Sequence, residues 1–233
     1  MAGHSKWAGI KHKKAIVDAR RGKLFTKLAR AITVAAKEGG GNPDMNFNLR
    51  LAIDKARAGN MPKDNIDRAI ARGTGEGGAV NVERVIYEGY APNGVAVLVD
   101  CTTDNRNRTV GEVRSVFTRH GCSIGESNSV AWQFAQRGTI AIPAEDLDAD
   151  DVTMAAIDAG AVDVESDADA VTVYTEVEDF ARVKNALAAA GYDTTEAELA
   201  MIPSVMAELD VADTLQVLKF IDKLENLDDV DRV

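Results

Sequence analysis

The sequence is poor in cysteine and has no long hydrophobic run. Its 233 residues include only Cys101 and Cys122, which form no CxxC pair and lack the spacing of metal ligands. We therefore expect two buried free thiols, as in a reducing compartment, rather than a disulfide framework. No stretch approaches the roughly 18 apolar residues that cross a bilayer. The charged N-terminus lacks the apolar segment of a secretory signal.

The usual catalytic motifs are also missing. There is no HExxH, no GxxxxGK[ST] and no recognisable Ser, His and Asp order. Residues 73–78 fit GxGxxG, but a helical pattern precedes them and a strand-like pattern follows, so we expect a hinge between domains instead of a dinucleotide site. The acidic run 146–151 lacks the glycine and closing Glu of a calcium loop. We expect no enzyme, no metal, no cofactor and no small-molecule substrate.

What the chain does have is a strong charge asymmetry. The formal net charge is −10, yet residues 1–75 hold 16 Lys and Arg against 6 Asp and Glu, a balance of +10. Residues 76–233 hold 11 against 31, a balance of −20. This division predicts that one module meets a polyanion. Nucleic acid is the first interpretation, and an anionic membrane surface or a solvated basic surface without a partner are the alternatives.

Residues 1–16 are expected to form a flexible basic arm, because they mix Lys with Gly, Ser and His and offer little to bury. Trp7 beside Lys6 could stack on an unpaired base while neighbouring cations meet phosphates. Alternatively, Trp7 pins the arm onto the first domain. The candidate nucleic-acid contacts in this part of the chain are Lys6, Trp7, Lys11, His12, Lys13, Lys14, Arg20, Arg21, Lys23, Lys27 and Arg30.

Residues 17–78 predict a basic domain of three short helices. Lys23, Lys27 and Arg30 share one stripe of the first helix, which we expect to face solvent. Apolar residues recur at helical spacing on another stripe of that helix, and in two further helices that begin after Pro43 and near Pro62. The predicted buried positions are Leu24, Phe25, Leu28, Ile32, Ala35 and Ala36, then Met45, Leu49, Ala52, Ile53 and Ala56, then Ile66, Ala69 and Ile70.

The remaining sequence predicts two acidic α/β domains. Asn93-Gly94 between two apolar runs indicates a hairpin, and a helix ending at Gly121 follows it. From residue 138 the order of elements is β-α-β-β-α-β, which is typical of a ferredoxin-like domain. The last helix, 212–227, has no strand left to pair with there, so we expect it to return to the hairpin module. The predicted domains are therefore 79–133 with 204–233, and an inserted domain, 134–203.

Two further elements of this region can be predicted. Arg106 and Arg108 are isolated cations in a polar loop that leads into a helix, an arrangement that can hold a phosphate. The alternative is a pair of local salt bridges.

The apolar stripe of the last helix is predicted to be Leu215, Leu218, Ile221 and Leu224.

Several long motifs resemble the YebC/PmpR family, namely GHSKWAGIKHKK, DARRGKLFTKLARAI, NMPKDNIDRAI, YEGYAPNGVAVLVDC and TDNRNRT. The resemblance is dense over residues 3–134 and looser beyond. It implies an α+β multidomain fold in which an N-terminal helical domain precedes two α/β domains, the third inserted in the second. It also implies a cytoplasmic, non-enzymatic regulator. Similar proteins continue beyond the last helix into a strand, so here we expect a short or missing edge strand.

The resemblance leaves three functions open. The family includes bacterial proteins labelled probable transcriptional regulators, which implies binding to DNA. It also includes a mitochondrial translational activator of a cytochrome oxidase subunit, which implies binding to RNA or the ribosome. No helix-turn-helix with an obvious base-reading face is evident, and a mobile arm with Lys, Trp and His suits irregular RNA. The third function is a protein-interaction adaptor whose basic segment is incidental.

Overall fold

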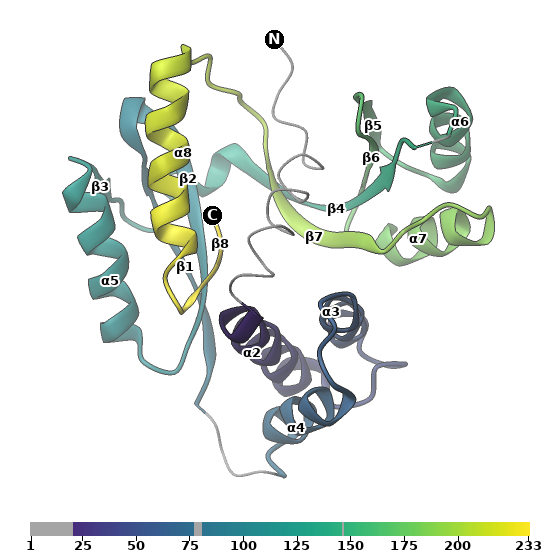
Figure 1. The fold of residues 1–233 in the computed structure, drawn as a ribbon, viewed down its shortest axis with the longest axis horizontal. Helices are drawn as coiled ribbons and strands as arrows, with labels where there is room; N and C mark the ends of the chain where they lie inside the picture. The colour runs from purple at the N-terminus through teal and green to yellow at the C-terminus, as the bar shows by residue number, and fades with distance from the viewer. Residues whose placement is uncertain (1–20, 77–80, 146) are drawn as a thin grey trace. The chain divides into compact units, whose positions relative to one another are not determined.

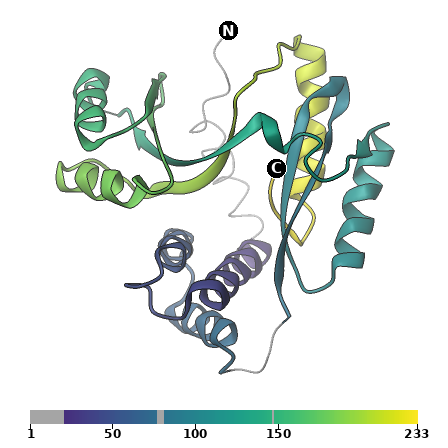
Figure 2. The ribbon, with the colours of Figure 1, turned by 180° about the vertical axis from the view of Figure 1, so that it is seen from behind.

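The computed structural model describes residues 21–76, 81–145 and 147–233. In these ranges the chain forms two four-stranded sheets and their associated helices (Figure 1; Figure 2). Its contacts define two compact units. The larger comprises Phe25–Ala52, Met61–Ala135 and Pro203–Val233, and the smaller is built mainly from Gln136–Ile202 and includes Ile53–Asn60. No helix within the described ranges combines the length and apolar character needed to span a bilayer.

Within the described residues three helices come first, as the sequence predicts. They are α2 (Arg21–Gly39), α3 (Phe47–Ala58) and α4 (Lys63–Thr74). The predicted hinge at residues 73–78 begins inside α4, which ends where Gly75 adopts a left-handed conformation with φ of 87°. Residues 77 and 78 of that hinge lie outside the described residues. The core positions confirmed as buried on α2 are Leu28, Ile32, Ala35 and Ala36.

The turn from α2 to α3 corrects one predicted core position. Met45 is 85% exposed and precedes α3, whereas the neighbouring Asn46 is buried. The Asn46 side-chain amide donates to the carbonyl oxygens of Ala35 at 2.7 Å and Gly40 at 2.8 Å, and its oxygen accepts from the Leu49 amide at 3.0 Å. Helix ends leave backbone groups without partners. A polar side chain that satisfies them therefore occupies the inner position, which periodicity alone assigned to a hydrophobe.

The larger unit contains a sheet with the strand order β3-β1-β2-β8. Strands β1 and β2 pair antiparallel over their whole length and are joined by the turn Pro92–Gly94, so the predicted hairpin is confirmed. Asn93 in this turn has a φ of 63°, a conformation that Asn adopts more readily than most residues. The strands are β1 (Glu83–Tyr90), β2 (Ala96–Thr103), β3 (Ser123–Ile124) and β8 (Val230–Arg232), and the helices are α5 (Arg106–Arg119) and α8 (Val211–Glu225).

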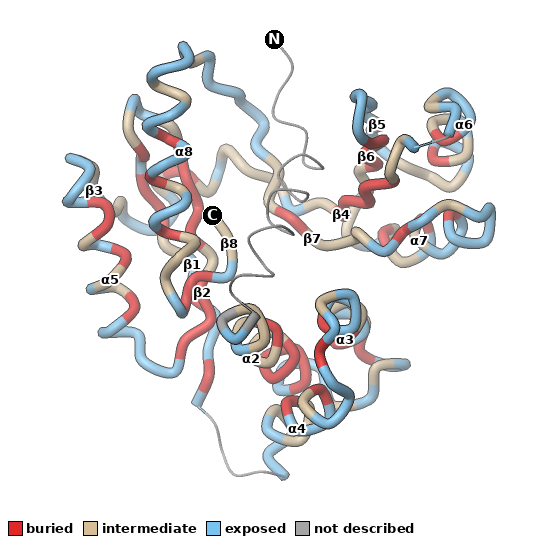
Figure 3. Tube along the Cα trace, viewed as in Figure 1, coloured by how far each residue is buried: buried red, intermediate tan, exposed pale blue. Residues whose placement is uncertain are grey.

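Helices α5 and α8 pack together on one face of this sheet. Phe117 of α5 meets Phe220 of α8 edge to face, with ring centroids 4.9 Å apart. Both rings belong to a buried cluster that also contains Val99 of β2 and Leu224 of α8. Figure 3 shows the buried positions of β1 and β2 in red and much of the outer surface of α8 in pale blue. The predicted return of the last helix to the hairpin module is therefore confirmed.

The buried stripe of α8 agrees with the predicted one at Leu224 and at the partly buried Ile221, and differs at the other two positions. Leu215 and Leu218 are 50% and 41% exposed, whereas Val217 and Phe220 are buried. Both sets follow helical spacing, so the period of the pattern does not choose between the two faces. Packing of Phe220 against α5 makes that choice.

The edge strand that was expected to be short or missing is present and short. Strand β8 pairs antiparallel with β2, with an irregular register between Asp100 and Cys101 of β2. The Val230 side chain of β8 is fully buried in the core shared with α5 and α8. A short edge strand is held here by its apolar anchor as well as by its backbone pairing.

The smaller unit contains the second sheet, with strand order β5-β6-β4-β7. The order of elements is β-α-β-β-α-β, and the central strand β4 pairs antiparallel with β6. This is the ferredoxin-like arrangement that the sequence predicts. Its elements are β4 (Phe134–Pro143), α6 (Ala149–Ala159), β5 (Asp163–Ser166), β6 (Ala170–Thr175), α7 (Phe180–Ala189) and β7 (Glu196–Pro203).

The chain leaves the first sheet after β3, builds the whole second sheet, and then returns with α8 and β8 to the first. A three-helix region followed by two α/β domains, the third inserted in the second, is therefore the fold. The α+β multidomain class predicted from the sequence is confirmed.

Candidate nucleic-acid interface

Most of the predicted nucleic-acid contacts lie at the N-terminal end of the chain. The backbone of Arg21 and Lys23 belongs to the start of α2, but their side chains are not among the described atoms. The positions of this set that lie outside the described residues are Lys6, Trp7, Lys11, His12, Lys13, Lys14 and Arg20. Four predicted contacts remain whose side chains the structure places, namely Lys27, Arg30, Arg106 and Arg108.

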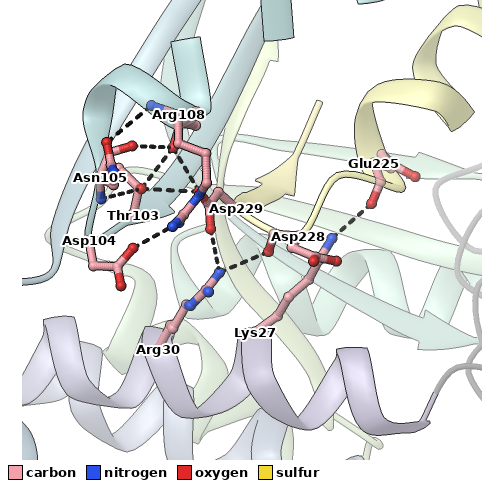
Figure 4. Close-up of polar contacts among 10 residues, drawn as sticks. Lys27, Arg30, Thr103, Asp104, Asn105, Arg108, Glu225, Asp228 and Asp229 are labelled. Carbon is pink, nitrogen blue, oxygen red and sulfur yellow. Dashed lines mark hydrogen bonds and ion pairs between the residues drawn. The ribbon is translucent and has the colours of Figure 1, made fainter. Parts of the chain in front are cut away.

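Lys27 and Arg30 of α2 point toward the segment that joins α8 to β8 (Figure 4). The Lys27 ammonium donates to the carbonyl oxygen of Glu225 at 2.8 Å. The Arg30 guanidinium donates to the carbonyl oxygen of Asp228 at 2.9 Å and to Oδ1 of Asp229 at 2.8 Å. Both residues were expected to face solvent. They instead hold α2 against the C-terminal segment, because backbone and carboxylate acceptors converge opposite this stripe.

The centre of this arrangement is Asp229, whose side chain is 1% exposed. Its Oδ2 accepts hydrogen bonds from Arg108 at 2.6 Å, from Thr109 at 2.7 Å and from Thr103 at 3.1 Å. With Arg30 on the other oxygen, these residues form a cluster that we call the Asp229 cluster. It joins α2, the end of β2, the first turn of α5 and the residue before β8.

The Asp229 cluster sets the charge state of its central carboxylate. Burial by itself raises the pKa of Asp229. The hydrogen bonds from Arg108, Thr109 and Thr103, together with the charge of Arg30, outweigh burial and hold the pKa below its ordinary value. A buried carboxylate that accepts from two guanidinium groups and two hydroxyls is therefore ionised in the folded protein.

Polar groups of the loop before α5 and of the first helical turn form hydrogen bonds with other groups of the same chain. The Asn105 side chain accepts from the Arg108 amide at 3.1 Å and caps α5, and the Arg108 side chain turns to Asp229 and to Asp104 at 2.8 Å. Arg108 thus pairs locally with Asp104 and, across the fold, with Asp229. Arg106 differs, because its side chain is 63% exposed and its contact with Glu83 is 3.5 Å long. A cation so exposed and so weakly paired is accessible to a phosphate.

Sequence reasoning missed Asp229 as an organising residue. It lies in an acidic stretch near the C-terminus, where its spacing suggests only a solvated face. Its partners are more than a hundred residues away in the chain, so no local motif could reveal it. Sequence reasoning also gave no role to Arg57 and Lys63 of the helical region. Their side chains are 71% and 87% exposed, with ion-pair contacts of only 3.7 Å and 4.0 Å.

The described residues show no candidate metal cluster, and both cysteines are free thiols. The described ranges contain no group of three or more His, Cys, Asp and Glu side chains arranged to hold a metal ion. Cys101 is buried as predicted, whereas Cys122 is partly exposed, which corrects that prediction. Burial raises the pKa of both thiols, so neither is a thiolate near neutral pH.

Known proteins resemble this chain along its whole length. Residues 5–76 match the family described as the TACO1/YebC protein N-terminal domain, and residues 82–233 match the TACO1/YebC second and third domain. A protein of Herpetosiphon aurantiacus named "Probable transcriptional regulatory protein" is 53% identical over 234 residues, which cover 100% of this chain and 93% of the relative. A protein of Geobacter sulfurreducens with a similar name is 52% identical over 233 residues, covering 100% and 94%.

Among solved structures, the crystal structure of a conserved hypothetical protein from Aquifex aeolicus superposes with a TM-score of 0.90 and 46% sequence identity. The match covers 98% of this chain and 94% of the other. At this identity the two chains share their fold over nearly their whole length.

Proposed function

Because the chain belongs to the TACO1/YebC family, we propose that it is a regulator of gene expression that binds nucleic acid through its basic N-terminal segment. The observation that carries the proposal is the concentration of 16 Lys and Arg against 6 Asp and Glu in residues 1–75 of a chain with a net charge of −10. Relatives are named probable transcriptional regulatory proteins, so the first form of the proposal is a DNA-binding transcriptional regulator without catalytic activity.

Phosphate contacts are assigned chiefly to the basic N-terminal segment, which comprises the arm and the residues after it up to Lys23. Its candidates are Lys6, Lys11, His12, Lys13, Lys14, Arg20, Arg21 and Lys23, with Trp7 as a base-stacking residue. Arg106 is a further candidate because of its exposure. Lys27, Arg30 and Arg108 already have acceptors within the chain. We propose that these three act mainly by fixing α2 and α5, and that they reach a phosphate only where it competes with those acceptors.

A second candidate is an RNA- or ribosome-binding translation factor. It is favoured by the engagement of Lys27 and Arg30, since a helix whose cations bind its own protein is poorly suited to enter a major groove. Contacts from a basic arm give affinity without reading base edges. Irregular RNA, with exposed phosphates and unpaired bases, suits such contacts.

The deciding experiment compares co-sedimentation with purified ribosomes and binding to random duplex DNA across a salt series. On duplex DNA each neutralised phosphate should contribute about 0.9 to the slope of log affinity against log salt. Ribosome binding that persists at salt concentrations where duplex binding is gone would indicate a translation factor. Duplex binding that survives moderate salt and prefers certain sequences would indicate a transcriptional regulator.

A charge-reversal variant tests the role of the arm in the same assay. Replacing Lys11, Lys13 and Lys14 with Glu should abolish binding in both formats. The matched control reverses three exposed cations of the acidic part, Arg114, Arg119 and Lys219, and should change binding little. If the arm variant binds ribosomes as well as the native protein does, the basic segment is incidental to that partner, and the adaptor hypothesis replaces the proposal.

A further inference from the structure

In the part of the chain that the structure describes, helices α5 and α8 cover one face of the sheet in the larger unit, and the other face carries exposed side chains of β1. The residues of β1 alternate between its two faces. Gly89 lies on the helix side, because a Cβ added there would come 2.6 Å from the Phe117 ring of α5. Ile86 and Tyr90, at the opposite parity, lie on the other face and are 45% and 43% exposed. Figure 2 shows strands β1 and β2 of this face in front of helix α8.

A second exposed aromatic residue lies beside Tyr90. Trp132 is 72% exposed, and its indole nitrogen donates to the carbonyl oxygen of Ser129 at 3.2 Å. The Tyr90 hydroxyl donates to the same carbonyl at 3.5 Å. The polar edges of the two rings therefore converge on one atom, and what the side chains leave open to solvent is mostly apolar ring surface. We call this pair the aromatic ledge.

The loop that carries Trp132 is fixed by a buried carboxylate. Glu88 of β1 is 8% exposed and accepts from the backbone amides of Asn128 at 2.6 Å, Val130 at 2.9 Å and Ala131 at 2.8 Å. Burial alone raises the pKa of Glu88, but these amide donors outweigh it and lower the pKa. These hydrogen bonds fix the backbone on both sides of Val130 and hence the position of Trp132. The negative charge of Glu88 is stabilised by the same backbone amides.

We propose that the aromatic ledge stacks unpaired bases of a single-stranded nucleic acid; this inference rests on the proposed function, in which the basic arm supplies the phosphate contacts. Large aromatic side chains are normally buried for most of their area. An exposed Tyr and Trp side by side form the kind of platform on which single strands stack their bases. A duplex does not fit the ledge, because its bases already stack on one another.

The fluorescence of Trp132 can show whether a base contacts its ring. The chain has 2 tryptophans, Trp7 and Trp132, so Trp7→Phe leaves Trp132 as the sole indole while keeping an aromatic ring in the arm. Emission is followed during titration with a 12-residue oligouridylate, a 12-residue oligothymidylate, a duplex of the same length and a base-free abasic strand of the same charge. The two base-bearing single strands should quench Trp132, and the duplex and the abasic strand should not. A difference in quenching between oligouridylate and oligothymidylate would show whether the ledge prefers RNA or DNA.

Affinity is measured in parallel by anisotropy of labelled oligouridylate. Trp132→Leu and Tyr90→Leu should each weaken binding about 5-fold to 100-fold, the range typical of removing one stacking partner. The matched control is Met45→Ala, which removes an exposed apolar side chain elsewhere and should leave affinity unchanged. Trp132→Tyr should restore most of the binding.

The outcomes separate this inference from the function on which it rests. If oligouridylate binds and depends on Lys11, Lys13 and Lys14 but leaves Trp132 emission unchanged, the ledge is not a stacking site and the proposed function stands. Equal quenching by the abasic strand would also overturn stacking. If no nucleic acid binds at all, both proposals fail.

Discussion

At the scale of single residues, the most consequential side chain is Asp229. It is buried, it lies just before a short edge strand, and it receives hydrogen bonds from α2, β2 and α5. A buried acceptor of this kind depends on every donor around it, because any partner left unpaired retains its desolvation cost. It therefore couples the helical region to the sheet within the larger unit.

Asp229→Asn should lower the free energy of unfolding by about 2 kcal/mol, since it removes the charge that two arginines share in a buried setting. Urea unfolding followed by circular dichroism measures the change. Asp104→Asn is the control: its side chain is 56% exposed and pairs with the same Arg108, so it should cost under about 1 kcal/mol. Equal losses in the two variants would show that the burial of Asp229 does not matter.

The same two variants can be compared across pH. The pKa of Asp229 is lower in the folded protein than its ordinary value of about 3.9. The unfolded chain therefore binds this proton more readily, and the contribution of Asp229 to stability is complete above about pH 4 and lost as pH falls through the folded pKa. The gap in stability between the native protein and Asp229→Asn should accordingly narrow in acid.

At the scale of helices and strands, α2 and α4 approach closely at Gly73. A Cβ added at Gly73 would lie 2.6 Å from the Cβ of Ala36 and closer still to the carbonyl oxygen of Thr33. The Thr33 hydroxyl also donates to the Ala69 carbonyl oxygen of α4 at 3.1 Å. Gly73 thus serves helix packing, a different role from the hinge that the Gly-rich sequence suggests.

Gly73→Ala should destabilise the protein by about 1–3 kcal/mol, because the helices cannot separate without losing buried contacts. Gly111→Ala in α5 provides a matched comparison, since nothing lies within 4 Å of the added Cβ there. Alanine is favoured over glycine within helices, so that variant should gain up to about 1 kcal/mol. Thermal unfolding of both variants measures the difference, and a neutral Gly73→Ala would contradict the close approach.

Secondary structure was largely predictable at this scale, and the errors share a cause. The hairpin, the β-α-β-β-α-β order and the three N-terminal helices follow from apolar periodicity and turn residues. Met45 and Leu215 were wrongly placed in the core, whereas Asn46 and Val217 occupy it. Periodicity identifies a helix, but the face that becomes buried depends on the neighbouring elements and on which backbone groups need partners.

At the scale of the whole molecule, the two residues at which the inserted ferredoxin-like domain begins and ends its connection to the first sheet lie next to each other. The Ser204 amide and its hydroxyl each donate to the Gln133 carbonyl oxygen at 2.7 Å. The core cluster of the first sheet, from Ala91 to Val230 in the chain, includes no residue of 134–203. The first sheet therefore has a core of its own, and the chain departs from it and returns to it at neighbouring residues.

Replacing residues 134–203 with a linker of about three glycines should leave a protein that unfolds cooperatively, because neither that core nor the Asp229 cluster is removed. Its affinity for nucleic acid should keep the salt dependence of the full chain if the arm carries the phosphate contacts. Chemical unfolding and the salt series test the two statements. Loss of cooperative unfolding would show that the first sheet depends on the insertion.

The sequence by itself determined the charge division, the elements and their order, the insertion, and the family to which the motifs point, because these depend on composition, local periodicity and contiguous motifs. The tertiary structure decided which cations are engaged and which stay accessible. It turned Lys27 and Arg30 toward the C-terminal segment, made Asp229 a buried acceptor, and brought Tyr90 and Trp132 to one carbonyl. Those outcomes arise between residues tens to hundreds of positions apart, where no local pattern carries the information.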